Sequence, residues 1–87
     1  MPTVALMWEA RAVQGRGAEL LAWMRTQRLT GERQPLRREV FTAPEDRVLA
    51  ITWWEGAYDA VVPELPDPPE DLVRRAVHRW RFESVGE

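Results

Sequence analysis

Few side chains in this 87-residue sequence have the chemistry of an acid, a base or a nucleophile near neutral pH. His78 is the only histidine, Tyr58 is the only tyrosine, and there is no cysteine. The unperturbed pKa of histidine lies near neutrality, which makes His78 a candidate general base, and its imidazole is also a candidate axial haem ligand. Tyr58 is a candidate hydrogen-bond donor to a substrate oxygen. The alternatives are a boundary histidine without a role and a tyrosine that only packs.

The candidate substrate-binding side chains are aromatic or cationic. Five tryptophans in so short a chain can form the wall of a pocket for a flat aromatic ligand, or they can fill a small core. Trp54 follows small residues on its side of a predicted strand, which leaves space beside it, whereas Trp53 follows bulkier ones. We therefore expect Trp54 and Trp80, with Tyr58 and His78, to line a pocket between the sheet and the helices. Arg38 can orient an anionic or phenolic group there, the alternative being a charge pair across neighbouring strands.

The composition excludes several classes of protein. A net charge of −2, from 12 basic and 14 acidic residues, provides no basic surface for nucleic acid. No Ser–His–Asp set, glycine-rich phosphate loop or carboxylate cluster has a usable spacing, and one histidine cannot form a histidine-rich cluster, so we expect no metal site. No apolar run approaches the roughly 18 residues of a membrane span, and the N-terminal residues lack a signal-peptide pattern. We therefore expect a cytoplasmic protein that does not bind membranes.

The hydrophobic pattern predicts one α+β domain over residues 1–87. Alternation of apolar with polar residues, or a continuous apolar run, predicts four strands, at residues 3–12, 36–42, 47–54 and 78–85. Helical spacing of apolar residues predicts one helix over 18–28 and a second that begins near Pro69. The resulting order, βαββαβ, is ferredoxin-like: a four-stranded antiparallel sheet with two helices on one face.

Two helices can cover only one face of such a sheet. The other face would carry Ala5, Met7 and one side of the apolar run 47–54. A large apolar face is rarely left in water. We therefore expect a homodimer in which the sheet of a second copy covers this face.

Two segments carry a resemblance to a known family. They are the first strand, glycine turn and helix between Val4 and Met24, and the stretch LRREVFTAPEDRVLAITWWEG over residues 36–56. Together they resemble the dimeric α+β barrel superfamily, and within it the antibiotic biosynthesis monooxygenase (ABM)-like group. The family's usual histidine-containing segment in the second helix has no match, and the asparagine used by the haem-degrading branch is missing.

The resemblance implies a cofactor-independent monooxygenase, or a related enzyme, that acts on a small aromatic or polyketide-like substrate. In that family the substrate itself supplies electrons to oxygen. The alternative is a non-catalytic dimeric module that binds a ligand or another protein. The two differ in the interior: a cavity of roughly 300 Å³ or more with convergent polar groups favours the enzyme, whereas a tryptophan-filled interior favours the module.

Overall fold

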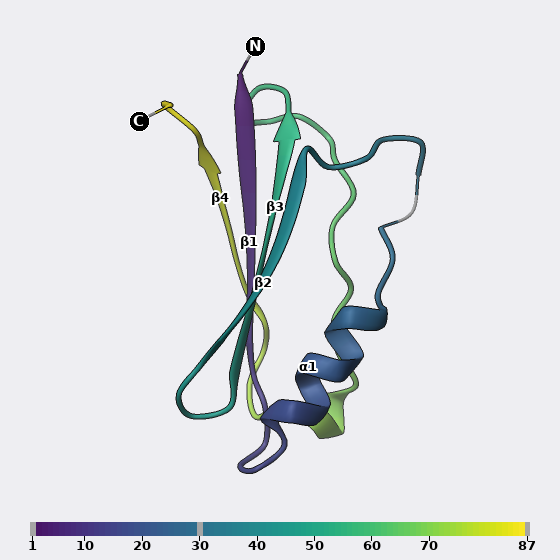
Figure 1. Cartoon of the computed structure of the whole chain (residues 1–87), viewed down its shortest axis with the longest axis vertical. Helices are drawn as coiled ribbons and strands as arrows, with labels where there is room; N and C mark the ends of the chain where they lie inside the picture. The colour runs from purple at the N-terminus through teal and green to yellow at the C-terminus, as the bar shows by residue number, and fades with distance from the viewer. Residues whose placement is uncertain (1, 30, 87) are drawn as a thin grey trace.

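The computed structural model describes residues 2–29 and 31–86. It is a small α+β fold with one α-helix and one four-stranded sheet (Figure 1). The predicted strands and the first predicted helix are confirmed to within two residues. The elements are β1 (Thr3–Arg11), α1 (Gly17–Thr26), β2 (Arg37–Ala43), β3 (Arg47–Glu55), a single 3₁₀ turn η1 (Glu70–Leu72) and β4 (His78–Glu83).

The sheet is antiparallel throughout, with strand order β2-β3-β1-β4. β1 and β3 are central, and Leu6 of β1 lies opposite Thr52 of β3 and Arg81 of β4. Buried and half-buried residues alternate along both central strands. One face of the sheet is therefore covered by the rest of the chain, and the other is not.

The prediction of a second helix that begins near Pro69 is wrong within the described residues. Only η1 is helical there, and Val73 instead forms an isolated bridge with Ala12 at the end of β1. The Arg74 N–H donates to the Arg11 carbonyl at 3.1 Å. Prolines exclude a helix before residue 70, and this extended pairing with β1 takes the place of helical bonds after it. The sheet thus carries one helix on its covered face, not two.

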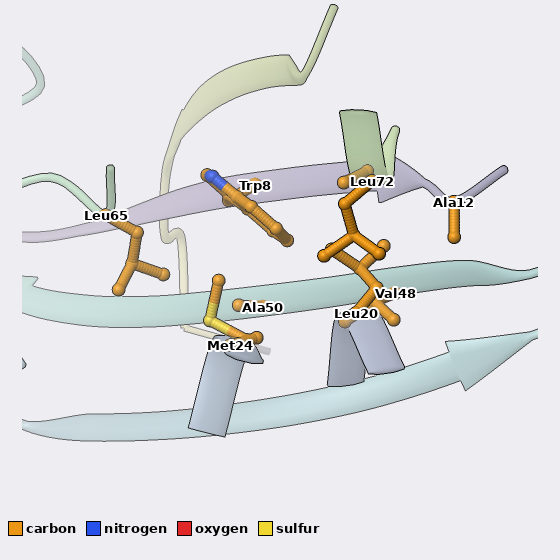
Figure 2. Packing of buried hydrophobic residues seen from close by; sticks show 9 residues of the cluster. Trp8, Ala12, Leu20, Met24, Val48, Ala50, Leu65 and Leu72 are labelled. Carbon is orange, nitrogen blue, oxygen red and sulfur yellow. The ribbon is translucent and has the colours of Figure 1, made fainter. Parts of the chain in front are cut away.

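An irregular segment, residues 57–69, lies on the same side of the sheet as α1 (Figure 1). We call it the cover segment. It contributes Val62 and Leu65 to the core, and Leu72 of η1 follows it there. Figure 2 shows Leu65 and Leu72 packed around Trp8 together with Leu20 and Met24 of α1.

Side chains of the sheet hold the backbone of the cover segment. The Trp8 indole N–H donates to the Pro66 carbonyl at 3.2 Å, and Arg79 Nη1 donates to the Leu65 carbonyl at 2.8 Å. Arg81 Nη1 donates to the carbonyls of Tyr58 and Ala60 at 2.9 and 2.7 Å. A segment without regular structure leaves its carbonyls unpaired, and these donors supply the missing partners.

The Asp46 carboxylate connects the β2–β3 turn to the start of α1. It accepts hydrogen bonds from the N–H groups of Gly15 and Gly17, at 2.9 and 3.1 Å. Asp46 has a positive φ of 62°, a conformation that aspartate tolerates better than most residues. A Cβ atom at Gly17 would lie 2.8 Å from this carboxylate, so the contact requires glycine there.

We expect Asp46→Ala to lower the free energy of unfolding by about 1–2 kcal/mol, the cost of losing a helix N-terminal cap. Urea unfolding followed by circular dichroism measures this change. Glu45→Ala is the matched control, because Glu45 lies in the same turn with a similar φ of 69° and forms an exposed ion pair with Arg11. Equal losses in the two variants would contradict the capping role of Asp46.

Candidate functional site

The uncovered face of the sheet is largely apolar at its centre, and we call it the open face. The register aligns its side chains in three rows across β4, β1, β3 and β2. The rows are Phe82–Ala5–Trp53–Arg37, Trp80–Met7–Ile51–Glu39 and His78–Glu9–Leu49–Phe41. Trp80 and Phe82 are about half exposed, at 46% and 51%. Such a continuous apolar face on a small protein is typical of an interaction surface.

Charged groups lie at the margins of the open face. The Glu9 carboxylate is only 13% exposed and accepts a hydrogen bond from Arg75 Nη2 at 2.6 Å. His78 Nδ1 lies 3.5 Å from the same carboxylate oxygen, and its ring meets Trp80 edge-on at 5.3 Å between centroids. On β2 at the opposite side, the Arg37 guanidinium lies over the Trp53 ring, 4.9 Å from its centroid.

The space between the sheet and the cover segment holds one small pocket of about 180 Å³. The polar residues in its lining are Thr52, Glu64, Arg79 and Arg81. Pockets for drug-sized ligands have volumes of roughly 300–1,000 Å³. The Thr52 hydroxyl already accepts a hydrogen bond from the Trp54 indole at 2.9 Å. This pocket has room for a small molecule of about one ring.

A larger open groove of about 730 Å³ follows the outer edge of β4, and we call it the β4 groove. Tyr58 and Val61 line it from the cover segment, and Trp80, Arg81 and Phe82 line it from β4. Tyr58 is 53% exposed. The groove therefore combines aromatic walls with a guanidinium group, a combination that suits a flat ligand carrying a negative charge.

The structure separates the predicted site residues. Tyr58 and Trp80 meet in the β4 groove, and His78 lies beside Trp80 on the open face. Trp54 lies in the core with no exposed surface, packed with Val4, so it is not at a pocket wall. Its side of the strand has small residues because α1 and the cover segment pack there.

Arg38 is also away from both pockets. Its Nη1 donates to the Gln27 carbonyl at 2.9 Å and its Nη2 to the Met24 carbonyl at 3.0 Å, which satisfies carbonyls at the end of α1. Burial lowers the pKa of the Arg38 guanidinium, and the charge of Arg28 adds to this effect. Arg38 thus stabilises the C-terminal end of the helix, where a positive charge is favourable.

Sequence reasoning missed two features of these sites. Glu9, Arg79 and Arg81 are recognisable as charges inside strands, but the alternation does not show that both arginines hold the cover segment. Arg75 reaches Glu9 only because the chain bulges between Val73 and His78, and this bulge has no signal in the sequence.

Comparisons with known proteins found no match among family models, curated proteins or solved structures. Within residues 2–29 and 31–86, no three acidic or histidine side chains cluster as a metal site would require. In the same part of the chain, no helix is long and apolar enough to cross a membrane.

We expect Trp54→Ala to destabilise the fold by about 3–5 kcal/mol, because it removes a fully buried indole and the hydrogen bond to Thr52. Chemical unfolding followed by circular dichroism tests this. Trp80→Ala, on the open face, is the control and should change the stability of the isolated chain far less. A Trp54→Ala variant with unchanged stability would contradict the core assignment.

Proposed function

We propose that this chain is a homodimeric binding module in which two copies pack their open faces together. The observation that carries the proposal is the row Trp80–Met7–Ile51–Glu39, apolar over three of its four strands and not covered by the described chain. Antiparallel sheets commonly bury one face and expose the other as polar, whereas here the exposed face is also apolar. A second copy presents the same apolar surface, and covering one with the other removes both from water.

The arrangement of the strands supports a ferredoxin-like fold of the dimeric α+β barrel type. Strand order β2-β3-β1-β4, with α1 between β1 and β2, is the order expected of a βαββαβ chain. In this proposal the cover segment and η1 occupy the place of the second helix. The ABM-like resemblance of the sequence therefore remains the proposed relationship.

Binding without catalysis is the function that the interior supports best. Trp8 and Trp54 are both buried in the layer between the sheet and its cover, and the pocket there is small, at about 180 Å³. The two proposed catalytic residues do not share one cavity, since Tyr58 lines the β4 groove and His78 lies beside Glu9 on the open face. The proposed ligand is a small flat aromatic molecule in the β4 groove.

An ABM-like cofactor-independent oxygenase is the second candidate, and the contact of His78 with Glu9 favours it. A carboxylate beside an imidazole orients the ring and supports its role as a base. The substrate would lie against Trp80, which contacts His78 and lines the β4 groove with Tyr58. His78 would remove a phenolic proton, and Tyr58 would donate a hydrogen bond to a substrate oxygen. The substrate would supply the electrons, with one atom of O₂ entering the product and the other leaving as water.

We expect the wild-type chain to sediment at micromolar concentration with twice its mass of 10.1 kDa, and Ile51→Glu to sediment as a monomer. The substitution places a charge in the middle row of the open face, where a dimer would bury it without a partner. Analytical ultracentrifugation measures both masses. Val13→Glu, in the turn after β1, is the control and should stay dimeric. A monomeric wild-type chain would overturn the proposal.

We expect a tricyclic phenol to quench tryptophan fluorescence without consuming O₂. Trp80→Leu should weaken its binding about 2- to 10-fold, because one aromatic contact contributes about 0.5–1.5 kcal/mol. Trp54→Phe is the matched control and should leave the affinity unchanged. Oxygen uptake that falls tenfold in both His78→Gln and Tyr58→Phe would instead establish the oxygenase.

A further inference from the structure

Exposed apolar side chains gather around β4. Five of the eight large hydrophobic residues that are exposed in the described chain lie on or beside this strand: Tyr58, Val61, Trp80, Phe82 and Val85. Trp80 and Phe82 belong to the open face, whereas Tyr58 and Val61 belong to the cover segment on the opposite side of the sheet. A partner that covers only the open face leaves Tyr58 and Val61, which is 92% exposed, in water.

The outer backbone of β4 is also free to bond. β4 is an edge strand that pairs only with β1 (Figure 1). The Ser84 N–H donates to the Thr3 carbonyl at 2.8 Å, which fixes the alternation of hydrogen bonds along the pair. The N–H and C=O groups of Arg79, Arg81 and Glu83 therefore point away from β1. None of them has a backbone partner within the described residues.

An added strand fits this edge better than a folded surface does. Successive side chains of a strand point to opposite faces, so one added strand reaches Trp80 and Phe82 on one side and the cover segment on the other. Its backbone also satisfies the outward N–H and C=O groups.

We propose that β4 pairs antiparallel with β4 of a second copy, about a two-fold axis that passes between their Phe82 residues. The charges of Arg81 and Glu83 favour a second copy of the chain as the partner, and they favour this register. With Phe82 opposite Phe82, Arg81 of each copy lies opposite Glu83 of the other. If the two-fold axis passed between the Arg81 residues, each Arg81 would lie opposite the Arg81 of the other copy. If it passed between the Trp80 residues, Arg79 of each copy would lie opposite Arg81 of the other. Like charges directly opposite each other are unfavourable, so both registers are disfavoured.

Arg81 keeps donors free for this contact. Both of its hydrogen bonds to the cover segment come from Nη1, so Nε and Nη2 remain for the carboxylate of the second copy's Glu83. The pairing is isologous, so taken alone it joins two copies and closes there. It does not require the face-to-face dimer proposed above, and it is smaller, so we expect it to be the weaker and more transient contact. Because the second strand would occupy the β4 groove, it and the aromatic ligand proposed there would exclude each other.

The absence of cysteine from the chain allows a direct test by disulfide trapping. The two Phe82 residues would form a non-hydrogen-bonded pair, whose Cα atoms lie about 4.5 Å apart, within the range that a disulfide spans. Trp80→Cys is the matched control: it lies on the same face of β4, but its two copies would be roughly 14 Å apart. In a glutathione buffer, Phe82→Cys should form a linked dimer at least tenfold faster than Trp80→Cys.

Three further substitutions separate this proposal from its alternatives. Glu83→Arg, added to Phe82→Cys, places arginine opposite Arg81 and should slow the trapping several-fold, whereas Glu83→Gln should slow it less. Ile51→Glu, which tests the face-to-face dimer, should leave the trapping intact. Equal rates for the two cysteine variants would overturn the proposal, as would no trapping, the result expected if the edge binds a foreign peptide. Trapping that disappears with Ile51→Glu would assign the Phe82 contact to the open-face dimer instead.

Discussion

The fold depends on side-chain donors that satisfy the carbonyls of segments without regular structure. A buried carbonyl without a partner costs about 1–3 kcal/mol, so a proline-rich segment cannot lie over a sheet unless donors reach it. Here Trp8, Arg79 and Arg81 bind the cover segment, and Arg33 donates to the carbonyl of Val61. A second helix would satisfy these carbonyls by its own backbone hydrogen bonds, but the prolines of the cover segment exclude a helix there.

This constraint gives a physical role to much of the arginine in the chain. Arginine carries five N–H donors in a rigid fork, and one guanidinium can bind two carbonyls, as Arg81 and Arg38 both do. Lysine has a single flexible ammonium group and reaches two separated carbonyls less well. The arginines on the covered side of β4 therefore stabilise the backbone, a role that does not require them to bind a substrate.

The sequence predicted the strands and α1 because alternation and helical spacing are local properties that burial enforces. It did not predict the conformation of residues 70–77. The apolar spacing there favours a helix, but the backbone instead pairs with Ala12 and Arg11, which is a tertiary interaction. The same limit applies to the site. Strand parity showed that Trp53 and Trp54 face opposite sides, but it could not show that packing against the cover segment fills the space beside Trp54.

β4 holds the cover segment with one side of the strand and presents aromatic side chains on the other. Its residues alternate between Arg79 and Arg81 on the covered side and His78, Trp80 and Phe82 on the open side. The arginines bind carbonyls of the cover segment, so the strand is held in place without a further strand at its outer edge. The aromatic residues are then free of any role in the core of the single chain. Because they pack little within it, their burial by another molecule is the simplest physical reason for placing them on an edge strand.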